Sequence, residues 1–242
     1  MELIRPDKPI DLRSEDKFQR YNFAQEIAKI VSSGNYTSSL VVGIYGKWGE
    51  GKTSVMNFIK AEIPKDTTVI INFNPWRFSD ENQLIHSFFS SIAVALKKRL
   101  ISRSKRALEL LGNYGDSIGS LSNIVLPGSG LVFNAGKKMA EKLNKESIEE
   151  LKKKVDDLII EANCNFVVFI DDIDRLNVEE VQAVFKLVKL LGDFPRTTYI
   201  LSFDEDMVAA ALGPKYGNRD KTSGYDFLEK IIQIPLHLPK AN

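Results

Sequence analysis

The chain has 242 residues, of which 43% are hydrophobic and 27% are charged, and its formal net charge is +1 at pH 7. This composition is that of an ordinary soluble protein, and the length suits one α/β domain that buries a full core. The single cysteine, Cys164, excludes an internal disulfide and a cysteine-rich zinc site, which fits a reducing compartment.

Strands and helices are predicted to alternate along most of the chain. Residues 1–16 are polar, unlike a signal peptide, so we expect a cytoplasmic protein. Apolar residues at helical spacing predict helices over 23–31, 54–62, 82–100, 141–162, 178–191 and 205–212. Apolar, β-branched and aromatic runs predict strands over 40–45, 68–73, 166–170 and 198–203, and a short fifth strand near 232–236. This alternation favours an α/β fold with a doubly wound, mostly parallel sheet, which binds ligands outside the carboxyl ends of its strands.

A glycine-rich loop, residues 46–53, follows the first predicted strand and has the pattern G-x-x-x-x-G-K-[ST]. Gly46 and Gly51 can take backbone angles that are closed to other residues, so that N–H groups turn toward anionic oxygens. Lys52 can reach the β and γ phosphates, Thr53 can bind Mg²⁺, and the dipole of the following helix favours the same anion. The loop therefore predicts a nucleoside triphosphate site, the alternative being a glycine-rich turn that binds nothing.

The predicted nucleotide contacts extend over the whole loop and the residue after it. Lys52 is also assigned a catalytic role, and Thr53 is assigned to the metal. Trp48 has two interpretations, because its ring can rest on the nucleotide or pack against an insertion expected later in the chain, at 101–165. The predicted contact residues are Gly46, Lys47, Trp48, Gly49, Glu50, Gly51, Lys52, Thr53 and Ser54.

Residues 101–165 break the alternation of strand and helix, so we expect a helical insertion there. Its middle is interrupted by Pro127 and Gly128 and lacks the roughly 20 uninterrupted apolar residues that cross a bilayer, so no membrane span is predicted. Between Lys97 and Lys154 the chain has thirteen Lys or Arg but six Asp or Glu. This surplus has two interpretations, a nucleic-acid contact surface or a solvated helical face. An apolar stripe is expected at Leu143, Ile148, Leu151, Val155, Leu158 and Ile159.

The predicted strand 166–170 is apolar throughout and leads directly into Asp171-Asp172-Ile173-Asp174-Arg175. Asp171 is placed to hold Mg²⁺ through water, and Asp172 is placed to polarise an attacking water. For Asp172 and Asp174 the alternatives are helix capping or a pair with Arg175, and for Asp174 these alternatives are favoured. Arg175 is assigned a catalytic role, supplying charge to the γ phosphate, although a carboxylate pair is favoured for its side chain.

Other polar residues follow the second and fourth predicted strands. Arg77 is another candidate for positive charge at the γ phosphate, whereas Trp76 and Phe78 are expected to anchor their loop in the core. Ser202 and Asp204 lie where a polar sensor of the γ phosphate is expected. A helix N-cap explains Asp204 almost equally well.

Three blocks of this sequence resemble the KAP family of P-loop NTPases. They are Gly-x-Trp-Gly-x-Gly-Lys-Thr-Ser at 46–54, Phe-Asn-Pro-Trp-Arg-Phe at 73–78 and Val-Phe-Ile-Asp-Asp-Ile-Asp-Arg-Leu at 168–176. Further similarity at 7–10, 23–24 and 227–235 extends the resemblance over most of the chain apart from the insertion.

The resemblance implies a sheet in which an extra strand separates the two Walker strands, those that precede the phosphate loop and Asp171. It implies ATP and Mg²⁺ as the bound species, and we expect the adenine contact near Pro9 and Ile10. It also implies one KAP-type domain over 1–242 that lacks part of a C-terminal helical segment. Many KAP proteins carry membrane helices between the Walker motifs, whereas this insertion is soluble in character.

Together, the residues and the resemblance predict Mg²⁺-dependent ATP hydrolysis by in-line attack of water. By resemblance, the nucleotide state controls assembly of a homo-oligomer or an attached effector. Bacterial KAP-type proteins are associated with phage exclusion, which suggests a role in anti-phage defence. Two other functions remain open, a nucleotide-binding switch or scaffold without hydrolysis and a small-molecule phosphotransferase.

Overall fold

The computed structural model describes residues 8–33, 37–77, 81–101, 148–216 and 221–240. The strands are β1 (Leu40–Tyr45), β2 (Thr68–Phe73), β3 (Asn165–Ile170), β4 (Thr197–Phe203) and β5 (Ile234–His237). The helices are α1 (Tyr21–Ser33), α2 (Lys52–Glu62), α3 (Glu81–Ile101), α7 (Ile148–Ala162), α8 (Val178–Lys186), α9 (Glu205–Tyr216) and α10 (Lys221–Ile231). Short 3₁₀ turns lie at Arg13–Glu15, Pro75–Arg77 and Ile173–Arg175, and a π-helical turn lies at Leu187–Leu191.

The five strands form one sheet in the order β2-β3-β4-β1-β5, and every neighbouring pair is parallel. β4 therefore lies between β1 and β3, which confirms the predicted extra strand between the two Walker strands. The last residue of β1, Tyr45, is opposite Phe203, and the last residue of β3, Ile170, is opposite Leu201. The loops after β1, β3 and β4 consequently leave the sheet at the same edge.

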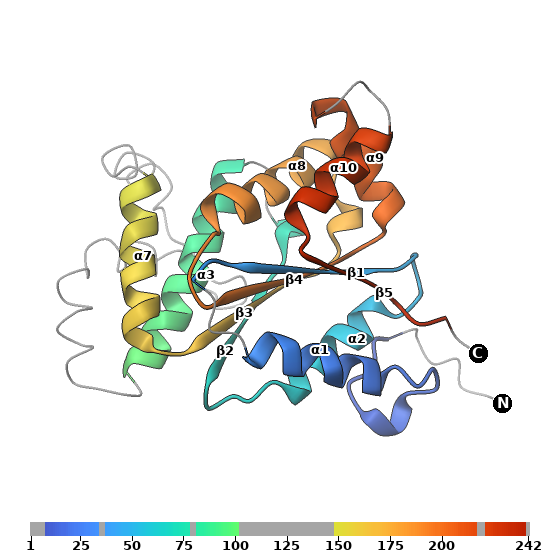
Figure 1. Ribbon diagram of the computed structural model, residues 1–242, viewed down its shortest axis with the longest axis horizontal. Coiled ribbons are helices and arrows are strands. Elements are labelled where there is room, and N and C mark those ends of the chain that lie inside the picture. Colours follow the sequence, from blue (N-terminus) through green and yellow to red (C-terminus); the bar gives the residue numbers. More distant parts are fainter. Residues whose placement is uncertain (1–7, 34–36, 78–80, 102–147, 217–220, 241–242) are drawn as a thin grey trace.

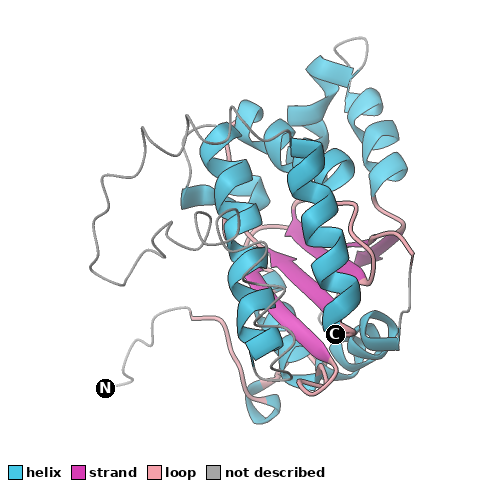
Figure 2. Ribbon diagram, turned by 90° about the vertical axis from the view of Figure 1, so that its left-hand side faces the viewer, coloured by secondary structure: helices cyan, strands magenta, loops and turns pink. Residues whose placement is uncertain are grey.

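Helices cover both faces of the sheet, as the doubly wound prediction requires (Figures 1 and 2). α1 and α2 pack on one face, where Val42 and Ile44 of β1 are buried with them. α3, α7, α8, α9 and α10 pack on the other face, where Val41 and Tyr45 of the same strand are buried. Successive side chains of β1 thus enter opposite core layers, because side chains alternate along a strand.

Most predicted elements agree with the structure to within a residue or two, but three differ. The helix predicted over 205–212 continues to Tyr216 as α9. The helix predicted over 178–191 ends as α8 at Lys186 and continues as a π-helical turn. α10 was not predicted, because Thr222, Ser223 and Gly224 are poor helix formers. A Cβ on Gly224 would lie 1.9 Å from the Ala209 carbonyl oxygen, so the glycine allows α10 to approach α9 closely.

α7 lies within the predicted insertion but packs in the core of the domain. Val155, Leu158 and Ile159 of the expected apolar stripe are buried in the same cluster as the α3 residues Phe88 and Phe89. α7 is therefore one of the helices that cover the sheet. Residues 102–147 of the predicted insertion lie outside the described residues.

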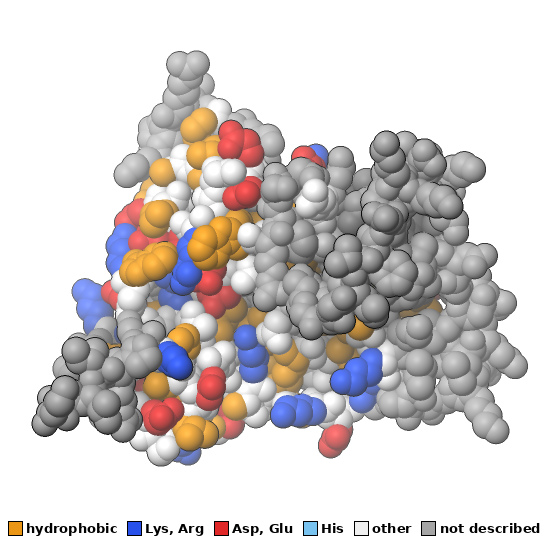
Figure 3. All heavy atoms as spheres, turned by 180° about the vertical axis from the view of Figure 1, so that it is seen from behind, with side chains coloured by type: hydrophobic (Ala, Val, Ile, Leu, Met, Phe, Trp, Pro, Cys, Tyr) orange, Lys and Arg blue, Asp and Glu red, His pale blue; other side chains and the backbone are white. Residues whose placement is uncertain are grey.

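The described surface carries mixed charge. On the face shown in Figure 3, basic, acidic and hydrophobic side chains are interspersed over the described residues. Part of the predicted basic surplus is paired, since Lys152 of α7 forms an ion pair with Asp156 at 3.2 Å. Within the described ranges, every helix is too short or too polar to cross a lipid bilayer.

Candidate nucleotide-binding site

The glycine-rich loop joins β1 to α2, and its glycines are required for two different reasons. Gly49 and Gly51 have φ angles of 80° and 83°, in the left-handed region that favours glycine. Gly46 is required by packing, because a Cβ there would lie 2.9 Å from the Leu238 side chain and 3.0 Å from that of Glu50. The special backbone predicted at Gly51 is therefore confirmed, but the one predicted at Gly46 is wrong, because Gly46 permits close packing and the second positive φ lies at Gly49.

The first turn of α2 offers main-chain donors beside this loop. The first helical hydrogen bond runs from Val55 N–H to Gly51 O at 3.2 Å, and no side chain caps the helix. The N–H groups of residues 51–54 thus have no acceptor within the helix. Such donors at the positive end of a helix dipole fit a phosphate group.

The Lys52 ammonium lies across the loop and makes three polar contacts. Its Nζ is 3.0 Å from Gly46 O, 3.3 Å from Lys47 O and 3.1 Å from Asp174 Oδ2. The Lys52 side chain is 9% exposed and that of Asp174 is 2% exposed. Asp174 therefore pairs with Lys52, whereas the sequence favoured helix capping or a pair with Arg175, because the 3₁₀ turn directs its carboxylate toward the phosphate loop.

Asp171 is held at the carboxyl end of β3 by the neighbouring strand. Ser202 Oγ donates to Asp171 Oδ1 at 2.6 Å, and the Asp172 N–H donates to the same oxygen at 2.9 Å. Ser202, predicted as a phosphate sensor, thus orients the predicted metal-binding carboxylate. A hydroxyl from Thr53 and one carboxylate suit Mg²⁺, which takes few protein ligands and keeps several waters.

Asp172 has a positive φ of 60° and lies at the turn where β3 ends. Such backbone in a residue other than glycine is uncommon and is found often at functional sites. Its Oδ1 is 2.8 Å from Arg175 Nε, the pair that the sequence left as the alternative. Partial burial, followed by the nearby Asp171 charge, raises the pKa of the Asp172 carboxyl.

Arg175 lies between the two tryptophans of the chain. Its guanidinium carbon is 4.6 Å from the Trp48 ring centre and 5.5 Å from that of Trp76, and the two residues are 65% and 56% exposed. The predicted core anchor at Trp76 is therefore wrong, because this residue lies in a turn beyond the end of β2. Phe78 lies outside the described residues, and Arg77 is placed in the same turn as Trp76.

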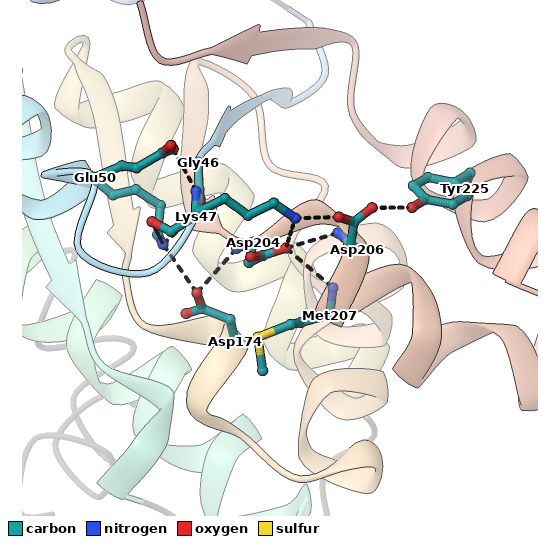
Figure 4. Close-up of polar contacts among 9 residues, drawn as sticks. Gly46, Lys47, Glu50, Asp174, Asp204, Asp206, Met207 and Tyr225 are labelled. Carbon is teal, nitrogen blue, oxygen red and sulfur yellow. Dashed lines mark hydrogen bonds and ion pairs between the residues drawn. The ribbon is translucent and has the colours of Figure 1, made fainter. Parts of the chain in front are cut away.

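A polar network connects the phosphate loop to α9 and α10 (Figure 4). Lys47 Nζ is 3.3 Å from Asp204 Oδ1 and is also paired with Asp206, whose carboxylate accepts from Tyr225. Its hydrogen bond with Asp206 raises the pKa of Lys47. Asp204 Oδ1 accepts the N–H groups of Asp206 and Met207 at 3.0 and 3.4 Å, so Asp204 is the N-cap of α9.

Three further hydrogen bonds involve the N-terminal segment beside the site. Arg20 donates to the Glu50 carbonyl in the loop and, from Nη2 at 2.9 Å, to the Pro239 carbonyl after β5. The Ile10 N–H donates to Ser54 Oγ at 3.1 Å, which places the segment expected to contact adenine beside α2. Sequence reasoning did not identify Arg20, because nothing in its local sequence indicates a bond to the loop.

The chain is similar in sequence to known proteins. The sequence profile of the KAP family P-loop domain matches residues 20–242. The "Phage T7 exclusion protein" of Escherichia coli (strain K12) is 26% identical over 264 residues, which cover 97% of this chain and 34% of that protein. The chain thus spans about a third of the length of this relative.

Two solved structures are similar over about half of their own length. One is the Aeropyrum pernix Orc1 protein in complex with DNA, with a TM-score of 0.46 and 14% identity over 98% of this chain and 48% of that chain. The other is Cdc6p from Pyrobaculum aerophilum, with a TM-score of 0.46 and 14% identity over 97% of this chain and 48% of that chain.

Proposed function

The chain belongs to the KAP family of P-loop NTPases, and from this premise we propose that it binds ATP with Mg²⁺ and hydrolyses the ATP. One observation carries the proposal. The phosphate loop after β1, Asp171 after β3 and Ser202 at the end of β4 meet at a single edge of the sheet, where Ser202 donates to Asp171 at 2.6 Å. This edge is where doubly wound sheets bind their ligands.

Some residues at this edge of the sheet bind the phosphates, and others hold Mg²⁺. Main-chain N–H groups of the first turn of α2 bind phosphate oxygens, and Lys52 adds a positive charge at the β and γ phosphates. Thr53 and Asp171 would hold Mg²⁺, which when bound neutralises charge on the β and γ oxygens. Phosphoryl transfer depends mainly on such positioning and electrostatic stabilisation.

The nucleophile is a water molecule that Asp172 aligns with the γ phosphate. The ionised Asp172 carboxylate accepts a hydrogen bond from this water and directs its lone pair toward phosphorus, in line with the leaving β phosphate oxygen. Arg175, 2.8 Å from Asp172, fixes the orientation of the carboxylate and places a cation near the developing charge.

A binding switch without hydrolysis is the second candidate, and one observation favours it. Asp172 is already engaged by Arg175 in this structure, which leaves its carboxylate less available to a water molecule. In that case ATP binding alone would change the state of the protein. The two candidates differ in the expected effect of a change at Asp172.

Hydrolysis and ATP binding measured on the same Asp172→Asn protein separate the two candidates. For the ATPase we expect binding to persist and the hydrolysis rate to fall about 10²–10⁴-fold, the usual contribution of a general base. Asp157→Asn, at an exposed position of α7, is the matched control and should keep the wild-type rate. An unchanged rate in Asp172→Asn would favour the switch, and tight ATP binding by Lys52→Ala would contradict both.

The biological role that we propose is anti-phage defence in the bacterial cytoplasm, with nucleotide state controlling a homo-oligomer or an attached effector. The support is the similarity to the phage T7 exclusion protein, of which this chain spans a third. Phage should form fewer plaques on bacteria that express the full-length protein than on bacteria that express its Lys52→Ala variant. If the nucleotide state controls a homo-oligomer, the molecular mass of the protein in solution should change when MgATP is added. Adding DNA to the same measurement tests whether the protein binds nucleic acid.

A further inference from the structure

The Lys52 ammonium has no donor left for a phosphate in this structure. A lysine ammonium has three N–H donors, and Lys52 Nζ has three acceptors, Gly46 O, Lys47 O and Asp174 Oδ2, at 3.0 to 3.3 Å. Two of these acceptors, Gly46 O and Lys47 O, belong to the phosphate loop. The Lys52 side chain has to stay over this loop in order to reach the phosphates. The third, Asp174, carries a negative charge and lies in the 3₁₀ turn that follows β3.

Asp174 is held in place independently of Lys52. The same Oδ2 oxygen accepts the Asp204 N–H at 3.1 Å, at the point where β4 ends and α9 begins (Figure 4). The 3₁₀ turn Ile173–Arg175 therefore presents this carboxylate to the phosphate loop from a fixed position. The Asp174 side chain is 2% exposed, so water does not replace the ammonium as its partner.

Both Lys52 and Asp174 are nearly buried, so neither charge can exchange its partner for water. Removing one partner of such a buried pair leaves an uncompensated charge and strongly destabilises the fold. A phosphate oxygen can take the place of the carboxylate, because it is also an anionic acceptor of N–H donors. An entering nucleotide thus has to replace Asp174 as the acceptor of one Lys52 proton.

We propose that Asp174 is the counter-ion of Lys52 in the nucleotide-free protein and that this ammonium transfers its hydrogen bond from Asp174 to a phosphate oxygen when a nucleotide binds. Asp174 is in this sense a positioning residue that lowers nucleotide affinity. Before binding, Asp174 holds Lys52 over the loop. After binding, its carboxylate stays near the phosphates and repels them, because both are negatively charged. The inference rests on the proposed nucleotide binding and adds a residue that regulates it.

Nucleotide affinity measured by calorimetry tests the exchange, with Mg²⁺ and a non-hydrolysable ATP analogue as the probe. Asp174→Asn removes the charge and keeps an oxygen that can accept the Asp204 N–H. We expect the dissociation constant to fall by about tenfold or more, because the ammonium no longer leaves a charged partner and no like charge remains near the phosphates.

Asp157→Asn is the matched control, because it removes the same charge from an exposed position of α7, a helix that contributes no residue to the candidate site. Its affinity should stay within about twofold of the wild type, since an exposed carboxylate interacts weakly through water. Unchanged or weaker binding by Asp174→Asn, with normal binding by the wild type, would overturn the exchange. Failure of the wild-type protein to bind would instead overturn the proposed function.

A second measurement needs no nucleotide and applies even if Asp174→Asn folds poorly. Asp174→Asn should lower the urea midpoint strongly when Lys52 is present, and adding Lys52→Met should recover most of that loss, because no unpaired ammonium remains. The double variant should therefore be more stable than Asp174→Asn alone. If it is equally unstable or less stable, Asp174 does not serve as the counter-ion of Lys52.

Discussion

At the scale of single residues, the candidate site is held together by side chains that bond to fixed partners at the ends of strands. Lys52 donates to carbonyls of its own loop, Arg20 connects the loop to the segment after β5, and Ser202 orients Asp171. Each of these side chains is largely buried, so a single change removes a partner that water does not replace. The position of Asp171, the predicted metal ligand, depends in particular on the hydroxyl group of Ser202.

Ser202→Ala should weaken Mg²⁺ binding more than it weakens the fold. The variant removes the hydroxyl that donates to Asp171 Oδ1, and loss of such an outer partner typically lowers metal affinity about 10- to 100-fold. The free energy of unfolding should fall by only about 1 kcal/mol. Magnesium titration of nucleotide binding gives the first value, and urea unfolding gives the second.

Ser91→Ala provides the comparison, because it removes a hydroxyl that donates to the Ser87 carbonyl within α3. Its magnesium dependence should match that of the wild type. Equal magnesium dependence in Ser202→Ala and Ser91→Ala would show that Ser202 does not orient a metal ligand.

At the scale of elements, close contacts between helices decide features that local sequence does not reveal. α10 begins with residues that disfavour a helix, yet Gly224 packs against the main chain of α9 at Ala209. α1 and α2 are joined by polar contacts, because Tyr21 and Gln25 both donate to the Glu62 carboxylate. Two predictions follow from these two junctions.

Gly224→Ala should destabilise the protein, although alanine is the better helix former. Helix propensity alone favours the variant by about 1 kcal/mol. The added Cβ would lie 1.9 Å from the Ala209 carbonyl oxygen, and overpacking against backbone costs roughly 1–3 kcal/mol or more. Urea unfolding decides the sign, and a more stable variant would mean that α9 and α10 are not packed as described.

The contact between Tyr21 and Glu62 should make stability depend on pH. The hydrogen bond from Tyr21, followed by that from Gln25, lowers the pKa of Glu62 below its ordinary value of 4.5. The ionised carboxylate therefore stabilises the fold above pH 4.5, and this contribution is lost as the pH falls through the lowered pKa of the folded state.

Tyr21→Phe removes the larger cause of that shift. Its melting temperature should lie below that of the wild type at neutral pH, and the two values should converge as the pH falls below the native pKa of Glu62. Melting curves between neutral and acidic pH give the comparison. A difference that grows toward acidic pH would contradict the assignment, since protonation removes the acceptor charge in both proteins.

At the scale of the whole molecule, two core layers fix the sheet and thereby the edge that carries the site. One layer lies under α1 and α2, and the other lies under α3, α7, α8, α9 and α10 (Figure 1). α7 belongs to the second layer although it lies in a region predicted as an insertion. The helix should therefore contribute to global stability, as a core helix does.

Leu158→Ala in α7 tests that contribution. Leu158 is 1% exposed, and truncating a buried leucine costs about 2–5 kcal/mol. Ile160→Ala is the matched control in the same helix, because Ile160 is 60% exposed and should cost about 0.5 kcal/mol or less. Equal urea midpoints for the two variants would indicate that α7 does not belong to the cooperative core.

Local pattern determined the strands, most of the helices and the phosphate loop, because these features depend on neighbours in the sequence. An apolar run at 166–170 followed by Asp171 predicts a buried strand with a carboxylate at its end, wherever that strand lies. The glycine-rich loop is equally local, since the positive φ angles at Gly49 and Gly51 belong to the turn itself. The strand order also agreed with expectation, although that expectation came from the KAP resemblance.

Only the tertiary structure decided how residues far apart in the chain are paired. Lys52 and Asp174 are 122 residues apart, and parallel strands bring them to the same edge of the sheet. The same edge joins Lys47 to Asp206 and Ser202 to Asp171. A sequence pattern identifies charged residues, but the partner of each charge depends on strand order and register. Those are set by how the two core layers pack, which no local segment specifies.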